Sequence, residues 1–409
     1  MKPPLKIAIY TGVIPNTTFI ETLIAGVAKE HEVLLFGTVK KNTSYPSKRI
    51  KIIDTPTSLY KNVPLTLWRA IKLGVKYPKR LALALKEAKT YSTNYTKWLR
   101  FSRFVPVLLY APDIFHLQWT SRIDRWLFLK SAYPCHIVVS LLGSQAAILP
   151  YIESEVLKRY QRCLPKVDAI HAISEHLGHQ ATNFNVFPER VQVIPTTIPA
   201  AAFSYYKPFE KRETQAFQLV SVGRHHWVKG YRYGIQAVHQ LIQSGIAIHY
   251  SIIAAGKIPE ALLFQVSQLG LQDHITFKPS LTQSELFEHL QTYDALLLPS
   301  LSEGIANVVL EAMAIGVPVI STNCGGMAEV VIPEKTGWLV PVRDPKAIAD
   351  AVKDCMDLEE EFKRKIIQQA YDLVSASYHE KHSVAKMLRL YDEVVGSMKL
   401  EARSGKLEV

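Results

Sequence analysis

Two glutamates, Glu303 and Glu311, lie eight residues apart in the segment 299–318 and have the chemistry to bind one ligand together. The apolar run Ala295–Leu298 predicts a buried strand, and the pattern after it predicts a helix over Ala306–Ile315. Glu303 would then lie in the loop between strand and helix, and eight helical residues span about 12 Å. Because a carboxylate accepts hydrogen bonds from neighbouring hydroxyls, one glutamate can bind a sugar ring while the other binds a distant ribose.

Two cations, Arg224 and Lys229, follow another predicted strand, Phe217–Val222. Arg224 is expected at the turn from strand to helix, with Lys229 about one helical turn later. Paired cations at the start of a helix can bind a diphosphate, because the free N–H groups of the helix also attract anions. The adjacent residues His225 and His226 are not expected to hold a metal, since neighbouring side chains point apart in most backbones.

Glycines mark two further loops where a ligand can approach the backbone. Gly325 and Gly326 precede Glu329 and predict a loop and helix start, although a tight turn that needs positive φ would also explain them. Gly12 follows the predicted strand Lys6–Tyr10, and its missing Cβ would let the Thr11-Gly12 turn approach a phosphate or a sugar. A plain turn is the alternative explanation for Gly12.

Alternating strands and helices must position these residues. The strands expected in the first half are Lys6–Tyr10, Glu32–Phe36, Ile114–Leu117, Ile137–Leu142, Ala169–Ala172 and Val191–Ile194. Those expected in the second half are Phe217–Val222, His249–Ala254, Ile275–Phe277, Ala295–Leu298 and Val317–Ser321. Leu65–Arg100 is predicted to be helical with a break near Pro78, and the polar stretch Tyr206–Gln215 is predicted to be a linker.

This alternation predicts an α/β protein with two doubly wound domains. The expected domains are residues 1–200 and 201–375, followed by a helical segment, 376–409, that can pack back on the first domain. Ligands of such sheets bind beyond the carboxyl ends of the strands. The cleft between two such domains is therefore the site expected by default.

Positive charge is concentrated in one segment of the 409-residue chain, which has 48 Lys and Arg against 36 Asp and Glu and a formal net charge of +12. Between Lys40 and Arg103, sixteen basic residues face only Asp54 and Glu87, a net +14, so the remainder carries −2. Aromatic residues such as Trp68 are interspersed among the basic ones. Nucleic acid, an anionic membrane surface and an anionic substrate are the three candidate partners, and a solvated basic face is the alternative.

Several classes of protein are disfavoured by what the sequence lacks. Its four cysteines are far apart and form no C-x-x-C pair, which argues against a zinc ribbon or a secreted disulfide scaffold and fits a reducing cytosol. The apolar run Ile7–Tyr10 is too short for a signal peptide. No stretch of about 18 uninterrupted apolar residues predicts a transmembrane helix. We therefore expect a cytoplasmic protein, with peripheral attachment to the cytoplasmic face of a membrane as an option.

The segment 299–318, with Glu303 and Glu311, resembles the E-x7-E signature of the retaining glycosyltransferases of family 4, which adopt the GT-B fold. The similarity continues in the second half through Val222–Arg224, Lys229-Gly230, Ser321–Glu329, Thr336–Val340 and Asp344. In the first half it is looser and rests on the opening strand, Pro15–Glu21, Asp113–Gln118 and Ala172–Glu175.

Three positions depart from the family pattern. Gln118 stands where the family often has the second histidine of H-x-H. Leu142–Gln145 replaces the common H-G-x-D, and Pro195–Thr197 replaces the usual Pro-Asn-Gly turn. The first two changes remove ionisable groups, so they affect acceptor recognition more than donor chemistry.

The resemblance implies a GT-B architecture of two Rossmann-like domains facing across a cleft. It implies catalytic roles for Glu303, Arg224, Lys229 and His116, although a buried, hydrogen-bonded histidine is the alternative for His116. It implies donor binding by Gly12, Gly223, Gly304, Ile305, Ala306, Glu311, Gly325 and Glu329. It implies acceptor binding by Gln118, Gly143 and Ser144.

The function that the resemblance implies is transfer of a sugar from a nucleotide-diphosphate sugar, with retention, to a glycan or lipid-linked acceptor of the cell envelope. No Asp-x-Asp occurs in the sequence, so neither a metal nor another cofactor is expected, and Arg224, Lys229 and helix dipoles would stabilise the leaving diphosphate. No nucleic acid partner is expected, because no RNA-binding motif is present. The alternatives are a sugar-nucleotide epimerase on the same fold and a non-catalytic polyanion-binding protein.

Overall fold

The computed structural model describes residues 3–40, 43–210 and 215–403 and divides the chain into two units. The first unit comprises Met1–Ile173, Gly178–Ile194 and Ser383–Val409, and the second comprises Ser174–Leu177 and Pro195–His382. Residues 211–214 of the predicted linker, 404–409 of the predicted C-terminal segment and Lys41 of the basic segment lie outside the described residues.

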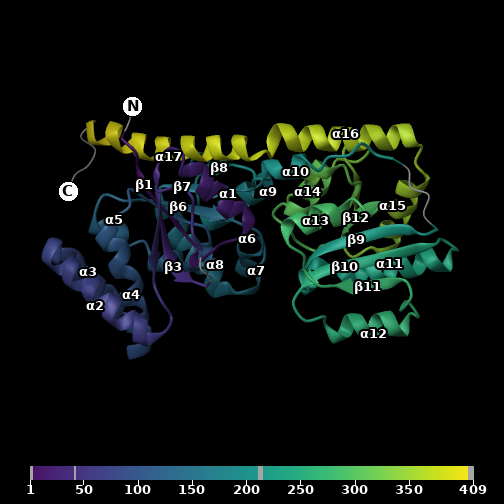
Figure 1. Cartoon of the computed structure of the whole chain (residues 1–409). Helices are drawn as coiled ribbons and strands as arrows, with labels where there is room; N and C mark the ends of the chain where they lie inside the picture. The colour runs from purple at the N-terminus through teal and green to yellow at the C-terminus, as the bar shows by residue number, and fades with distance from the viewer. Residues whose placement is uncertain (1–2, 41–42, 211–214, 404–409) are drawn as a thin grey trace. The chain divides into compact units, whose positions relative to one another are not determined.

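An eight-stranded parallel sheet forms the centre of the first unit, in the order β2-β3-β1-β5-β6-β7-β8 with β4 beside β3 (Figure 1). The strands are β1 (Lys6–Tyr10), β2 (Gly12–Ile14), β3 (Glu32–Val39), β4 (Ile50–Asp54), β5 (Ile114–Leu117), β6 (His136–Leu141), β7 (Ala169–Ala172) and β8 (Val191–Val193). The expected Thr11-Gly12 turn is wrong at its second residue, because Gly12 begins β2 and pairs with Gly37. The carboxyl ends of β1, β5 and β6 are neighbours at one edge of this sheet.

The helices that accompany this sheet are α1 (Thr18–Val27), α2 (Leu59–Lys76), α3 (Pro78–Lys89), α4 (Asn94–Tyr110), α5 (Leu129–Ala132), α6 (Ser144–Ala147), α7 (Leu149–Ile152) and α8 (Ser154–Cys163), with a 3-10 helix η1 over Thr120–Arg125. The short helix α9 (Glu175–Gln180) is divided, with its residues up to Leu177 in the second unit and those from Gly178 in the first. The predicted helix break near Pro78 is confirmed, because α3 begins there, and a second break separates α3 from α4.

The final helix, α17 (Glu380–Arg403), contributes Met387, Leu390 and Tyr391 to the core of the first unit. It packs tightly on α1, since a Cβ placed on Gly26 would lie 2.5 Å from Cγ2 of Val384. Figure 1 shows α17 running alongside the first unit. The predicted packing of a C-terminal helix on the first domain thus corresponds to a contact in the structure.

The second unit has a six-stranded parallel sheet in the order β11-β10-β9-β12-β13-β14. Its strands are β9 (Phe217–Arg224), β10 (Ile248–Ala255), β11 (Ile275–Lys278), β12 (Ala295–Leu298), β13 (Val319–Thr322) and β14 (Trp338–Val340). Its helices are α10 (Ala200–Phe203), α11 (Tyr231–Gln243), α12 (Glu260–Gln268), α13 (Gln283–Leu290), α14 (Asn307–Ile315), α15 (Pro345–Asp357) and α16 (Glu360–Ser377).

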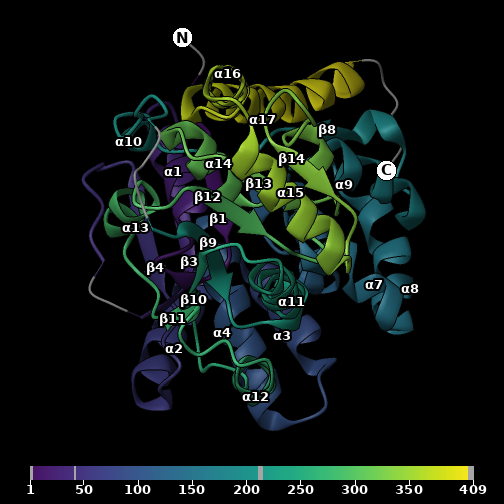
Figure 2. The ribbon, with the colours of Figure 1, turned by 90° about the vertical axis from the view of Figure 1, so that its right-hand side faces the viewer.

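Both faces of the second sheet are covered. One buried cluster gathers α13, α14 and α16, and another gathers α11, α12 and α15, with α11 and α15 side by side in Figure 2. Two covered faces explain why β12 reads as the uninterrupted apolar run Ala-Leu-Leu-Leu, with every side chain buried. The predicted α/β class, with two doubly wound units, is confirmed.

No helix in the described ranges is long and apolar enough to cross a membrane.

Candidate functional site in the second unit

Three loops meet at the carboxyl edge of the second sheet, because β9, β12 and β13 are adjacent parallel strands. The segment after β9 touches the loop after β12: the N–H of Leu301 donates to the carbonyl of Val228 at 2.7 Å. A Cβ on Gly230, whose φ is +63°, would lie 1.9 Å from the carbonyl oxygen of Pro299. Only glycine permits this approach, which holds the predicted diphosphate-binding segment against the loop that carries Glu303.

The Gly325-Gly326 pair brings the loop after β13 against the same segment. A Cβ on Gly325, whose φ is +58°, would lie 1.7 Å from the carbonyl oxygen of Glu303. The N–H of Gly326 donates to the carbonyl of Gly304 at 2.9 Å. The pair therefore combines the positive φ of a tight turn with close packing on the backbone of the predicted donor-binding loop.

Lys229 and Glu303 form an ion pair in this site. Lys229 Nζ lies 2.7 Å from Glu303 Oε1, and both side chains are only 15% exposed. The hydroxyl of Ser300 donates to the same carboxylate oxygen at 2.8 Å. The structure thus brings two of the predicted catalytic residues into direct contact and fixes the glutamate from two sides.

Arg224 is the exposed last residue of β9, whereas the sequence places it at a turn. In the described part of the chain, no ion pair involves its guanidinium. Its charge acts on Tyr231, where burial and Glu303 raise the pKa of the phenol and Arg224 opposes them. Arg224 is therefore a cation near Lys229 and Glu303 that an anionic ligand can reach. Gly223 precedes it, and a Cβ there would lie 2.8 Å from the Tyr231 hydroxyl.

Glu311 lies inside α14 and is 9% exposed. Burial raises the pKa of its carboxyl group, and a hydrogen bond of 3.0 Å from Gln283 Nε2 opposes that rise. The expectation of eight helical residues between the two glutamates is wrong, because α14 begins at Asn307 and Glu303 lies in the loop before it. Of the other predicted donor-binding residues in that loop, Ile305 and Ala306 are buried.

Glu329 already has partners within the second unit. Its carboxylate accepts hydrogen bonds from the backbone N–H groups of Glu175 and His176, at 3.0 and 2.9 Å. These N–H groups open α9, where a negative charge is stabilising. The predicted contact between Glu329 and a donor stays a prediction.

The predicted residues of the first unit separate into an accessible group and a buried group. Gly12, with φ +83°, lines a cavity of about 220 Å³ at the carboxyl end of β1. Gly143, with φ +51°, has open space where a Cβ would stand, and Ser144 after it is exposed. These three residues come shortly after β1 and β6, the two neighbours of β5 in the sheet.

His116 and Gln118 belong to the buried group, at 0% and 1% exposure. The hydroxyl of Tyr391 lies 2.6 Å from His116 Nδ1, and Ser140 Oγ lies 2.8 Å from His116 Nε2. Ser140 Oγ is also 2.9 Å from Nδ1 of His171, whose Nε2 lies 2.8 Å from the carbonyl of Ile194. The structure therefore gives His116 the environment of the alternative interpretation, a buried and hydrogen-bonded histidine.

The proton positions along this chain follow from the carbonyl at its end. A carbonyl only accepts, so His171 Nε2 carries the proton, His171 Nδ1 accepts from Ser140, and His116 Nε2 donates to Ser140. His116 Nδ1 then accepts from Tyr391. Burial holds the pKa of His116 well below its usual value, so both rings are neutral and the network ties α17 to β5, β6 and β7.

Sequence analysis missed several residues of these sites. Ser300 stands inside the quoted segment 299–318, but its contact with Glu303 depends on the loop conformation. Gln283, the partner of Glu311, lies in no motif. In the first unit, Arg100 and Arg103 count toward the basic segment, yet their gathering with Arg122 and Arg125 at one cavity has no local signal in the sequence.

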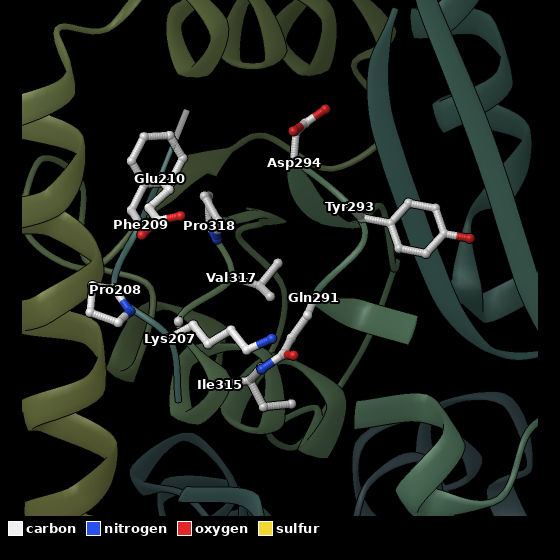
Figure 3. A pocket seen from close by; sticks show the side chains of 11 residues that line it. Lys207, Pro208, Phe209, Glu210, Gln291, Tyr293, Asp294, Ile315, Val317 and Pro318 are labelled. Atoms are coloured by element: carbon white, nitrogen blue, oxygen red, sulfur yellow. The ribbon is translucent and has the colours of Figure 1, made fainter. Parts of the chain in front are cut away.

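A further cavity, of about 370 Å³, lies away from the predicted site (Figure 3). Asp294 and Pro318, which line it, immediately precede β12 and β13, so this cavity is at the amino edge of the second sheet. Figure 3 shows the side chains of Lys207 and Gln291 extending toward each other across it. Its place on the opposite edge separates it from Arg224, Lys229 and Glu303.

Comparison with known proteins agrees with the fold and with the predicted family. Residues 206–373 match the family described as "Glycosyl transferases group 1", which confirms the predicted resemblance over this range. A colanic acid biosynthesis glycosyltransferase of Salmonella typhimurium, as its name describes it, is 29% identical over 236 residues, 56% of this chain and 57% of that protein. An amylovoran biosynthesis glycosyltransferase of Erwinia amylovora is 30% identical over 210 residues, which are 49% of this chain and 50% of that protein. The aligned part of the chain spans about half the length of these curated relatives.

Solved structures share the fold across nearly the whole chain. Sucrose-phosphate synthase of Thermosynechococcus elongatus aligns with a TM-score of 0.72 at 17% identity, covering 96% of this chain and 100% of its own. The HepE protein of Anabaena, solved with UDP and glucose, has a TM-score of 0.68 at 14% identity, with 95% and 100% coverage. The predicted GT-B fold class is therefore confirmed.

Proposed function

We propose that the protein is a glycosyltransferase that moves a sugar from a nucleotide-diphosphate sugar to a glycan or lipid-linked acceptor. The observation that carries the proposal is the convergence of Arg224, Lys229 and Glu303 at the carboxyl edge of the second sheet. Cations at this position neutralise a leaving diphosphate, and a fixed carboxylate orients the hydroxyls of the donor sugar.

The chemistry proposed for this site needs no metal and proceeds with retention at the anomeric carbon. Arg224, Lys229 and the start of α14 supply the positive potential that a divalent ion would otherwise provide. The departing phosphate takes the proton of the acceptor hydroxyl as the new bond forms on the same face of the sugar. Glu311 accepts hydrogen bonds from the ribose, a role that its low exposure and fixed Gln283 partner favour.

The names of similar proteins support the substrate classes. Two relatives are named for the biosynthesis of the polysaccharides colanic acid and amylovoran, and HepE was solved with UDP and glucose. We therefore propose a role in polysaccharide or cell-envelope glycan synthesis, with UDP-sugars as the first donors to test.

Donor binding and Arg224 provide the direct test. Thermal unfolding with UDP-, GDP- and ADP-sugars should show one class that raises the midpoint, because a ligand of the native state stabilises by mass action. With that donor, Arg224→Ala should lower turnover about 100-fold or more, as for loss of one oxyanion donor, whereas Lys346→Ala, at an exposed lysine of the same unit, should not. Stabilisation by none of the donors, or equal turnover in both variants, would refute the proposal.

Two further measurements separate the competing chemistries. Incubation with donor alone should leave the donor sugar unchanged at C2, whereas an epimerase would convert it without any acceptor. NMR of the product should show the anomeric configuration of the donor. Turnover should also survive an excess of EDTA, and a loss that Mg²⁺ or Mn²⁺ restores would contradict the metal-independent route.

We also propose that α2 lies on an anionic membrane surface near a lipid-linked acceptor. Its exposed apolar side chains recur every four residues, so that each lies beside the next and the series winds slowly around the helix: Leu59, Val63, Leu67, Ile71 and Val75. Val75 is 84% exposed and Ile71 is 68% exposed. Lys72, whose Nζ lies 3.6 Å from the ring centre of Trp68, extends from the same helix. An exposed apolar face beside lysines is typical of helices that bind in the plane of a bilayer.

Liposome flotation tests this attachment. The wild type should float with vesicles containing phosphatidylglycerol and much less with neutral vesicles, because lysines contribute about 1 kcal/mol each near an anionic surface. Ile71→Glu/Val75→Glu should abolish flotation, whereas Phe187→Glu, at an exposed apolar residue outside the basic segment, should not. Equal flotation of both variants would show that α2 is not the contact.

A further inference from the structure

Four arginines surround the cavity of about 220 Å³ at the carboxyl end of β1 in the first unit. Arg100 and Arg103 come from one face of α4, since residues three apart on a helix are neighbours, and Arg122 and Arg125 come from η1. All four affect the pKa of Tyr10, the last residue of β1. Burial raises the pKa of its phenol, and the four guanidinium groups oppose that rise. Four positive charges thus converge on one small space next to Gly12.

Among the described residues, no carboxylate pairs with these charges, and the guanidinium of Arg100 instead lies over the ring of Tyr91, 5.1 Å from its centre. In the described ranges, no ion pair involves any of the four, and Asp124 influences Arg125 only from beyond ion-pair distance. Nε of Arg100 and Nη1 of Arg125 are fully buried and have no hydrogen-bond partner. Burial and the neighbouring arginines lower the pKa of Arg125 to about 10. Buried guanidinium donors without acceptors are costly, so the arrangement is suited to an anion that supplies the acceptors.

A second cavity adjoins the first, shares Tyr10, Thr11 and Arg122 with it, and has no other charged residue in its lining. It has a volume of about 170 Å³, and Trp119, Ser121 and Gln145 line it. An indole ring with hydroxyl and amide groups beside it can hold a sugar ring by stacking and hydrogen bonding. The two cavities together offer a place for a sugar next to a strongly cationic place.

We propose that the four-arginine cavity binds a phosphate or diphosphate group carried by the acceptor, next to the acceptor sugar. This inference rests on the proposed glycosyltransferase function and names the acceptor class. Four cations match a multiply charged phosphate better than a single carboxylate, and the planar guanidinium binds phosphate oxygens in pairs. The donor diphosphate is assigned to Arg224 and Lys229 of the second unit, which leaves this cavity for the acceptor.

Pyrophosphate is the probe for the test, by calorimetry at low ionic strength. The wild type should bind it with UDP present in saturating amounts, because the two anions occupy different sites. Arg125→Gln and Arg103→Gln should each weaken pyrophosphate binding at least tenfold and leave UDP binding unchanged. Lys97→Gln, on α4 but outside the cavity, should change neither. Loss of pyrophosphate binding in saturating UDP, or undiminished binding in both arginine variants, would overturn the proposal.

Further measurements test whether a loss of pyrophosphate binding reflects disturbed folding and whether pyrophosphate occupies the donor site instead. Arg125→Gln should raise the thermal midpoint of the ligand-free protein, because it removes an uncompensated half-buried charge. Arg103 has no unpartnered buried nitrogen, so its variant reports binding even if changes at Arg125 disturb folding. Arginine-dependent pyrophosphate binding by a protein that binds no nucleotide sugar would uphold this site and refute the proposed function. Pyrophosphate binding abolished by Arg224→Ala alone would assign the anion to the donor site and overturn the inference.

Discussion

Replacement of Gly325 by alanine tests whether the loops at the second sheet edge are packed as the structure shows. The added Cβ would lie 1.7 Å from the carbonyl oxygen of Glu303, whereas Cβ atoms essentially never come closer than 3.0 Å. The two loops must therefore separate by at least 1.3 Å at this point. The positive φ adds a backbone cost of about 1–2 kcal/mol for a residue with a Cβ.

The expected effect on catalysis is larger than the effect on stability. A displacement of about 1 Å of a positioning group can lower a rate about 100-fold, so Gly325→Ala should lose about that much turnover. Gly270→Ala is the matched control, because Gly270 has a similar φ of +66° and open space around the Cβ position. Both variants should lose the stability that the positive φ costs, Gly325→Ala should lose more because of the clash, and only Gly325→Ala should lose transfer activity and donor stabilisation. Wild-type activity in Gly325→Ala would refute the close packing of the two loops.

Three further predictions concern buried polar groups. Tyr391→Phe leaves His116 Nδ1 without its donor and should lower the free energy of unfolding by about 1–3 kcal/mol in urea titrations. Burial lowers the pKa of His171 to about 4, so the unfolded chain binds a proton at this histidine more tightly than the folded chain does. In urea titrations, the contribution of His171 to stability should be complete above about pH 6.5 and should decrease as the pH falls toward 4. The decrease should be smaller in His171→Gln. Burial raises the pKa of Glu311, so ionisation of this carboxyl group costs the folded wild type stability as the pH rises above 4.5. Glu311→Gln should therefore become more stable relative to the wild type over that range. Its donor binding at neutral pH, measured by calorimetry, should be weaker.

Strands buried on both faces could be predicted closely from the sequence. Lys6–Tyr10, with its buried centre Ile7–Ile9, and Ala295–Leu298 have the observed bounds, because a short apolar run between turn signals identifies such strands. The strands β2 and β14 were missed because each has only three residues, and β4 was missed because charged residues interrupt its apolar ones. Local hydrogen bonds determine at which residue a helix begins, which explains why α14 begins one residue later than predicted.

The residues of the second unit could be named from motifs, but their contacts could not. Lys229 and Glu303 meet because β9 and β12 are neighbours in the sheet, and strand order depends on the whole chain. For His116 the motif suggested chemistry, whereas its environment is completed by Tyr391, 275 residues later. Four arginines of the first unit likewise converge from two helices, and neither helix alone signals a site.

The partnership of α17 with β5 also determines when the first unit can complete its fold. Met387, Leu390 and Tyr391 fill its core, yet the ribosome makes them after the whole of the second unit. During synthesis, the core formed by Ile9 and Val138 of the sheet and Val27 of α1 stays incomplete until α17 emerges. Contacts over so long a stretch of chain form slowly, because the loop that joins them must close first. Docking of α17 is thus the step that completes the native core of the first unit during folding of a newly synthesised chain.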